Sequence, residues 1–273
     1  MRRFKRGFGL LCRIVTQRGA AFFLTLTLAL VLWGAASPVS AAERAAEDKK
    51  VLFAPLSDSV GVQMEQFIER VIRQAEGERA ALVVFELDTP AGLLSATHGI
   101  VRTILASRVP VVLWVPPGGR AASAGAFMVQ AAHVAVMASG TNIGAAHPVV
   151  ASGRDLPEED MKKKVVNDLE AQMRTLTHLR GRNSDAAQRM IRESLSLTAH
   201  EALAEGVVDL LADDRETLIA AVSGRVVTVG SDSVRIELAP GAAVERVEMT
   251  WQEGLIQFLS SPDIAYFLLM GGL

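Results

Sequence analysis

Residues 109–127 read VPVVLWVPPGGRAASAGAF, and they predict a strand, a sharp corner and a helix in that order. The run of β-branched and apolar residues over 109–115 is typical of a buried strand. The small residues after Ser123 are typical of a helix start. A serine at such a corner has an exposed hydroxyl beside the unpaired N–H groups of the helix N-terminus. The spacing approximates the nucleophile elbow, with Ala121 where the stricter motif has glycine.

The rest of the chain alternates between strand and helix patterns. Short apolar runs predict further buried strands at 51–56, 81–87, 132–138 and 207–212. Helical periodicity predicts helices at 62–75, 93–107, 124–132, 158–180, 184–194 and 199–205. This alternation predicts an α/β domain with a mainly parallel sheet. Alternating segments at 226–229, 234–238 and 244–249 predict a small antiparallel β appendage on the C-terminal side.

Composition excludes several classes of function. The chain has 273 residues and a formal net charge of −2, and it has no polybasic block outside its N-terminus, so nucleic-acid binding is not indicated. The single cysteine, Cys12, lies in the N-terminal segment, which excludes disulfides and thiol catalysis in a mature chain. No metal-ligand spacing and no phosphate-binding glycine loop occurs, and we expect no cofactor.

The two ends of the chain have their own character. Residues 1–41 combine a basic region, an apolar run over 20–33 and a small-residue cleavage site, which predicts an export signal, with an uncleaved membrane anchor as the alternative. Residues 42–50 are expected to be a linker. The apolar segment 254–273 has a last run well short of the roughly 20 residues that cross a bilayer. It suits an interfacial helix, a dimer contact or the opening of a membrane span.

Acyl transfer by Ser123 requires a base and donors for an oxyanion. Gly92 follows a predicted strand in the turn 88–93, where its backbone could approach a substrate closely. His147 is one candidate base. A lysine is another, because Ser–Lys pairs are a recognised variant of the triad, and the helix predicted from 158 carries lysines 162–164.

Several motifs in order resemble the NfeD family of membrane-associated serine proteases, which belongs to the superfamily of Clp peptidases and signal peptide peptidase A. These motifs are DTPAG at 88–92, GRAASAG at 119–125, GTNIGAA at 140–146, KVVND at 164–168, GRN at 181–183, LSLTAHEA at 195–202 and GVVD at 206–209. The resemblance covers roughly residues 50 to 270. It implies a Clp/crotonase-like spiral of repeated ββα units over 51–222, followed by the β appendage at 223–253.

The resemblance also implies a Ser–Lys dyad. Ser123 matches the nucleophile and Lys164 the base, while the backbone N–H groups of Gly92 and Ala124 match the oxyanion donors. Lys162 is the fallback, because it falls within the apolar stripe of its helix whereas Lys164 lies beyond the edge. His147 is a possible groove residue or, as in Clp-type triads, an alternative base that lacks its orienting acid. Ala91 departs from the usual Pro-Gly-Gly of the family.

The function that these motifs imply is an exported, membrane-associated serine endopeptidase, either membrane-held or periplasmic. Its substrates would be peptides or apolar segments of membrane proteins, such as stomatin-like partners, and a homo-oligomer is expected because superfamily members commonly assemble. One alternative is a catalytically weak or inactive scaffold in membrane organisation. Another is a crotonase-like acyl-thioester enzyme, which the export signal argues against.

Overall fold

The structure, a computed structural model, describes residues 50–149, 158–238 and 241–260. The predicted export segment 1–41, nearly all of the linker 42–50 and the last apolar run 264–270 lie outside these residues. Across the described ranges, no helix combines the length and the apolar character needed to cross a membrane.

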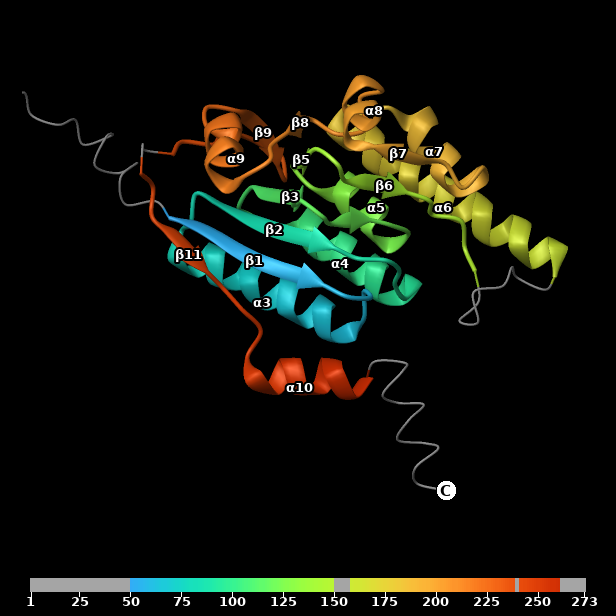
Figure 1. The fold of residues 1–273 in the computed structure, drawn as a ribbon, viewed down its shortest axis with the longest axis horizontal. Helices are drawn as coiled ribbons and strands as arrows, with labels where there is room; N and C mark the ends of the chain where they lie inside the picture. Colours follow the sequence, from blue (N-terminus) through green and yellow to red (C-terminus); the bar gives the residue numbers. More distant parts are fainter. Residues whose placement is uncertain (1–49, 150–157, 239–240, 261–273) are drawn as a thin grey trace, which may run out of the picture. The chain divides into compact units, whose positions relative to one another are not determined.

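Six parallel strands form the main sheet, in the order β11-β1-β2-β3-β5-β8 (Figure 1). Their bounds are β1 Val51–Ser57, β2 Leu82–Asp88, β3 Val111–Val115, β5 Val134–Met137, β8 Leu210–Leu211 and β11 Val244–Arg246. Strands buried on both faces become continuous apolar runs, which is why the sequence shows β1, β2, β3 and β5 so clearly. The strands predicted at 51–56, 81–87, 109–115, 132–138 and 207–212 are confirmed.

Helices cover both faces of the sheet. Their bounds are α3 Val62–Glu78, α4 Leu94–Ala106, α5 Ala124–Ala131, α6 Glu159–Arg180, α7 Ser184–Arg192, α8 Ala199–Ala204 and α9 Arg215–Val222. The larger buried cluster lies between one sheet face and helices α3 to α8, and the smaller lies between the other face and α9. The six helices predicted from periodicity are confirmed, and α9 is an addition to them.

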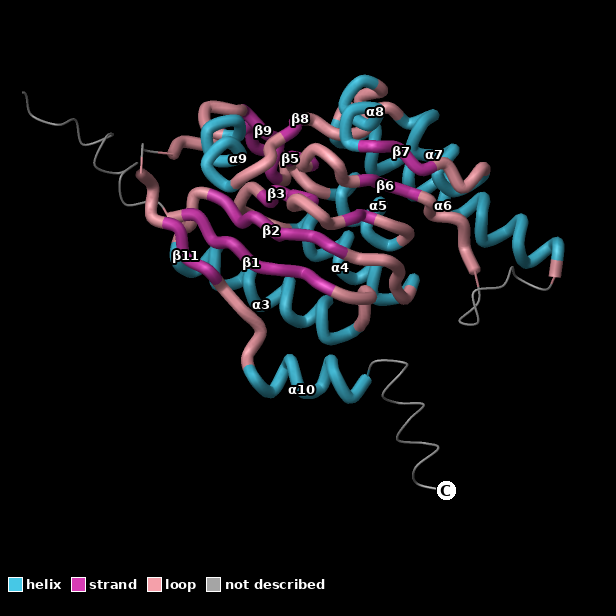
Figure 2. Tube along the Cα trace, viewed as in Figure 1, coloured by secondary structure: helices cyan, strands magenta, loops and turns pink. Residues whose placement is uncertain are grey.

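A second sheet of three short strands gives the fold its repeat. It contains β4 Arg120–Ala121, β6 Asn142–Gly144 and β7 Ser196–Thr198. The chain runs β3-β4-α5 and β5-β6-α6, and single bridging residues take the place of the short strand between β1 and α3 and between β2 and α4. This is the expected Clp-like spiral of ββα units. Figure 2 shows β6 and β7 as short magenta segments.

The C-terminal side differs in part from the prediction. Strands β9 Val226–Val229 and β10 Asp232–Arg235 form the expected antiparallel hairpin. The third predicted segment, 244–249, does not join them, because β11 pairs in parallel with β1 at the edge of the main sheet. The otherwise open edge of β1 supplies the hydrogen-bonding groups: Val51 N–H donates to the Ala243 carbonyl, and the Phe53 carbonyl accepts from Val247 N–H.

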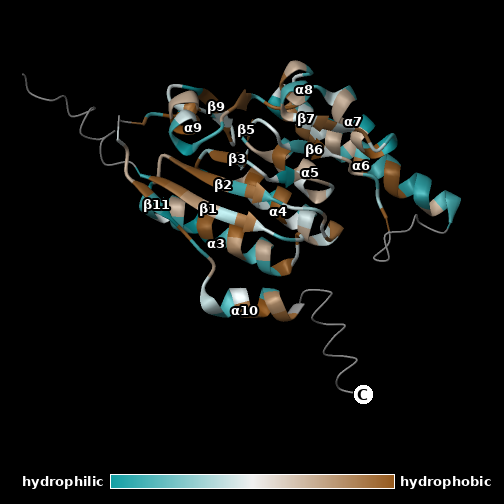
Figure 3. Ribbon diagram, viewed as in Figure 1, coloured by the Kyte–Doolittle hydropathy of each residue, from teal (hydrophilic) through white to brown (hydrophobic). Residues whose placement is uncertain are grey.

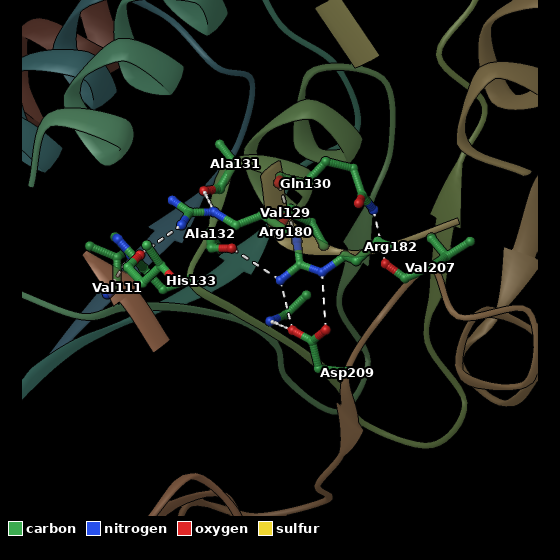
Figure 4. Close-up of polar contacts among 12 residues, drawn as sticks. Val111, Val129, Gln130, Ala131, Ala132, His133, Arg180, Arg182, Val207 and Asp209 are labelled. Carbon is green, nitrogen blue, oxygen red and sulfur yellow. Dashed lines mark hydrogen bonds and ion pairs between the residues drawn. The ribbon is translucent and has the colours of Figure 1, made fainter. Parts of the chain in front are cut away.

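One buried guanidinium organises the C-terminal end of α5 (Figure 4). Arg182, with a side chain only 2% exposed, donates from Nε and Nη2 to the two carboxylate oxygens of Asp209 at 3.1 and 2.7 Å. Its remaining hydrogen bonds go to the carbonyls of Val129, Gln130 and Ala132. These carbonyls lie at the C-terminal end of α5, where the Val129 carbonyl also accepts a longer bond from the Ala132 N–H at 3.3 Å, and a cation beside them complements the helix dipole. Arg182 therefore holds α5 in place against the strand that follows it.

Replacing Arg182 by methionine should lower the free energy of unfolding by about 3–5 kcal/mol, because the change removes the cation that pairs with the partly buried Asp209 carboxylate and one hydrogen bond from each of three carbonyls. Urea denaturation followed by circular dichroism measures the loss. The matched control is Arg189→Met, which removes an exposed pair with Glu193 and should cost no more than about 1 kcal/mol. Equal losses in the two variants would contradict the role given to Arg182.

His133 should make stability depend on pH. Its Nδ1 accepts a hydrogen bond from Val111 N–H at 3.1 Å, and burial, helped by the charges of Arg180 and Arg182, lowers its pKa from 6.5 to about 3. Below pH 6.5 His133 is protonated in the unfolded chain but stays neutral in the folded protein. The free energy of unfolding therefore falls by about 1.4 kcal/mol for each unit by which the pH is lowered.

The measurement is the free energy of unfolding at several values between pH 7 and pH 5, in the wild type and in His133→Asn. Asparagine offers an amide oxygen near the position of Nδ1 but does not titrate. We expect the variant to have the shallower pH dependence over this range. Parallel curves would show that another group is responsible.

Candidate active site

Ser123 occupies the strained corner between β4 and α5. Its backbone has φ 50° and ψ −109°, a conformation that non-glycine residues rarely adopt and that is found at functional sites. The Ser123 N–H donates to the Ala145 carbonyl at 2.8 Å, which fixes the corner to the segment after β6. The side chain is half-buried, and its hydroxyl makes no hydrogen bond to another described residue. The predicted strand–corner–helix geometry is present.

Gly92 and Ala124 lie against each other beside this corner. A Cβ added to Gly92 would lie only 2.7 Å from the Ala124 Cβ and 2.5 Å from the Val60 Cβ, so the 92 backbone approaches both residues closely. Among the described residues, neither the Gly92 N–H nor the Ala124 N–H donates to a backbone carbonyl. Two unused donors beside a serine hydroxyl are what an oxyanion hole requires.

Thr89 shapes the turn that carries Gly92, a role that the sequence pattern does not reveal. Its buried hydroxyl bonds to the Asp58 carbonyl at 2.7 Å and to the Ala91 carbonyl at 2.9 Å, and its methyl group approaches the α5 backbone at Gly125. Ala91 is not among the residues with positive φ, so alanine fits where the family has glycine. The departure from the family motif therefore leaves the turn without strain.

The two candidate lysines lie on the first turns of α6, away from the buried part of the helix. No residue from 159 to 168 is buried, whereas the later turns bury Leu169, Met173 and Leu176. Lys164 is exposed and Lys162 is half-buried. No hydrogen bond or ion pair joins Lys164 to Ser123 in the described part of the chain. The structure thus brings Ser123, Gly92 and Ala124 together.

His147 connects the corner to α7. Its Nδ1 lies 2.8 Å from the Ile191 carbonyl oxygen, so Nδ1 carries the proton and donates it to the helix end. The neighbouring Ala146 N–H donates to the Met190 carbonyl, and Ala145 accepts from Ser123 N–H. The histidine therefore ties the corner loop to the last turn of α7.

The fold and the corner define an α/β protein of the Clp-like class with a serine at a nucleophile elbow. Comparison with protein families agrees: the family described as NfeD1b, N-terminal domain, matches residues 50–228. The chain belongs to the NfeD family, as the sequence motifs indicate.

Two curated relatives extend this result. The membrane-bound protease PH1510 of Pyrococcus horikoshii is 34% identical over 220 residues, which is 77% of this chain and 48% of the relative. The membrane protein NfeD1b of Bacillus subtilis is 32% identical over 109 residues, or 40% of this chain and 24% of the relative. The chain spans about half the length of the first relative.

Solved structures of 1510-N, described as a membrane protease specific for a stomatin homolog from Pyrococcus horikoshii, have the same fold. One is 29% identical with a TM-score of 0.68 and covers 78% of this chain and 99% of its own. A second, a lysine-to-alanine mutant in complex with a substrate peptide, is 30% identical with a TM-score of 0.72 and covers 78% of this chain and 98% of its own.

Replacing Gly92 by alanine should destabilise the protein by about 1–3 kcal/mol, since the added Cβ would overlap Val60 and Ala124. Thermal unfolding provides the measurement. The matched control is Gly77→Ala on α3, where a Cβ meets nothing within 4 Å and helix propensity should leave stability unchanged or raise it by up to about 1 kcal/mol. A neutral Gly92→Ala variant would show that the turn is not held against α5.

Proposed function

We propose that this protein is a serine endopeptidase with a Ser–Lys dyad, acting at a membrane. The observation that carries the proposal is the corner itself, where Ser123 has a strained positive φ and lies beside the unused N–H groups of Gly92 and Ala124. Backbone strain of this kind persists only where the surrounding structure enforces it, and strained residues are common at active sites. Membership of a family whose relatives include a membrane-bound protease supports the same activity.

Two of the similar structures support the choice of residues. They are a serine-to-alanine mutant and a lysine-to-alanine mutant of 1510-N membrane-bound stomatin-specific protease. The two mutated positions in that chain lie 41 residues apart, and Ser123 and Lys164 have the same separation. Lys162, which fits the apolar stripe of α6 better, does not have this spacing.

The chemistry would proceed in two steps. The Ser123 Oγ attacks a peptide carbonyl while the uncharged Lys164 amine accepts the hydroxyl proton. The Gly92 and Ala124 N–H groups donate to the oxyanion that forms. The Lys164 ammonium then protonates the leaving amine as the peptide bond breaks. In deacylation the Lys164 amine accepts a proton from the attacking water and passes it to the Ser123 oxygen as the ester bond breaks, which releases the acid product.

This mechanism requires the Lys164 amine to come within hydrogen-bond reach of Ser123 and to lose its hydration. A lysine is a base only when its amine is neutral, and removal from water favours the neutral form. The first turns of α6 contact the core only through the half-buried Val165 and Val166, so a shift of these turns when a peptide binds would disturb few buried contacts. Catalytic hydrogen bonds are often long in unliganded enzymes and tighten with substrate.

Apolar residues around the Gly92 turn support an apolar substrate. Val62, Leu93 and Leu94 are 47, 57 and 43% exposed, and the pairing of Val60 with Gly92 places them at one end of the sheet. Such residues would contact the apolar segment of a membrane protein, and a stomatin-like partner is the proposed substrate because 1510-N is described as specific for a stomatin homolog. We further propose export across the inner membrane, membrane association and a homo-oligomeric assembly.

A second candidate function is a non-catalytic scaffold in membrane organisation. The exposure of Lys164 favours it, since a lysine fixed in water cannot take the serine proton. The two functions differ in what Lys164 does when a peptide is bound.

Cleavage of an apolar peptide by the purified full chain separates them. Ser123→Ala and Lys164→Ala should each lower kcat/KM by at least about 10³-fold, because the two residues act as one unit. The control is Lys163→Ala, which removes an exposed neighbour and should retain the wild-type rate. Loss of activity in Lys162→Ala instead of Lys164→Ala would transfer the role of base to Lys162. A wild type that cleaves no better than Ser123→Ala would establish the scaffold.

A further inference from the structure

The last described helix, α10 Trp251–Ser260, is oriented with its apolar face outward. Its half-buried residues are Glu253, Gly254 and Gln257. Five large apolar side chains are exposed on it: Trp251, Leu255, Ile256, Phe258 and Leu259. A surface helix normally turns its apolar stripe to the core and its polar residues to water. α10 does the reverse, and Figure 3 shows hydrophobic residues on this helix, which lies outside the sheet and its covering helices.

Polar contacts fix this orientation. Arg70 on α3 makes a bidentate pair with Glu253, with Nε and Nη2 at 2.9 and 2.8 Å from the carboxylate oxygens, and Nη2 also donates to the Glu248 carbonyl. Gln257 donates to the Ser57 carbonyl at 3.3 Å. Bidentate arginine–carboxylate pairs are geometrically specific. The helix is therefore attached to α3 and β1 through its polar side, which leaves the apolar side for another surface.

The outward face of α10 has no charge. Glu253 is the single ionisable residue between 251 and 260, and it is directed at Arg70. Trp251 is 76% exposed and Phe258 57%. Contiguous apolar surface without charge marks a place where a soluble protein contacts a partner or a lipid surface.

We propose that this face of α10 lies in the interface of a lipid bilayer. Ten residues of helix extend about 15 Å, which is enough to lie on a membrane and too short to cross one. A tryptophan at the helix start suits the headgroup region, where an aromatic ring has one apolar and one hydrated side. The sequence also continues into IAYFLLM at 264–270, a second apolar run that follows shortly after the helix.

A second copy of the chain is the competing occupant. A stable dimer buries about 800 Å² on each partner and uses 20–30 residues a side. The outward face of α10 offers five large apolar side chains, which is too few for such an interface. The lipid surface needs no shape complementarity and accepts a single short helix.

This attachment would also orient the candidate active site. Gln257 joins the second turn of α10 to Ser57, the last residue of β1. Just beyond that strand end, Val60 pairs with Gly92 of the proposed oxyanion hole. If α10 binds the lipid surface, the carboxyl end of β1 and the turn that carries Gly92 lie near the membrane. The attachment itself does not depend on catalysis.

Trp251 is the natural probe for this proposal. The full chain is reconstituted in phosphatidylcholine–phosphatidylglycerol vesicles with brominated or unbrominated acyl chains, and the emission of Trp251 is taken as the wild-type spectrum minus that of Trp251→Phe. We expect the Trp251 emission to be strongly quenched by brominated lipid and shielded from aqueous acrylamide. A Trp251 that acrylamide reaches freely and brominated lipid does not quench would overturn the proposal. So would shielding that depends on protein concentration and not on lipid, since that result identifies a second copy as the occupant.

A variant pair tests the helix face without removing the probe. Ile256→Ser combined with Phe258→Ser should lose most of the lipid quenching of Trp251, whereas the control Gln252→Ser, also exposed on α10, should keep it. Circular dichroism checks that the variants fold. If the wild-type protein cleaves peptide through Ser123 but brominated lipid does not quench Trp251, the membrane contact is wrong and the peptidase proposal stands. If brominated lipid quenches Trp251 but the protein cleaves nothing, the peptidase proposal is wrong and the membrane contact stands.

Discussion

The bidentate pair between Arg182 and Asp209 fixes the helix on which the candidate site depends. α5 is eight residues long and wholly buried, with Ser123 capping its start and Arg182 capping its end. A short buried helix cannot leave its terminal carbonyls unpaired, and Arg182 supplies most of the side-chain donors, while Arg180 donates to the Ala131 carbonyl. The strained φ of Ser123 is maintained because α5 is held at its C-terminal end and the Ser123 N–H is held by Ala145.

The proposed site is divided between residues on buried elements and a lysine on a more exposed stretch of helix. Ser123, Gly92 and Ala124 lie together on elements with buried cores. Lys164 lies on the first turns of α6, where no side chain is buried. An enzyme that keeps its nucleophile and oxyanion donors ready but completes its base with the substrate would act only where a peptide, or a reagent that mimics one, occupies the site. In this family member, the relation between the two parts would set when cleavage occurs.

Much of the fold could be predicted from the sequence because the central strands and helices have strong patterns. Continuous apolar runs identify β1, β2, β3 and β5, and helical periodicity identifies α3 and α6. The strands β4, β6 and β7 have two or three residues, too few to show any period. β11 has the alternating pattern of a hairpin strand, but it pairs in parallel with the edge of β1.

The candidate site, like the fold, could be predicted from the sequence only in part. The corner at Ser123 and the glycine at 92 are local features, so a sequence motif finds them. The roles of Thr89 and Arg182 depend on contacts between distant segments, which no local pattern records. The outward orientation of α10 was equally hidden, since periodicity shows that a helix is amphipathic but not which side faces the core.

Mapping the reaction of the wild-type chain with a fluorophosphonate tests the central claim most directly, because the reagent reports an activated serine hydroxyl beside oxyanion donors. Digestion and mass spectrometry identify the modified residue. We predict a single adduct on Ser123, formed far faster than on any other serine of the chain. Adducts spread over exposed serines, or none at all, would contradict the claim that this corner activates its hydroxyl.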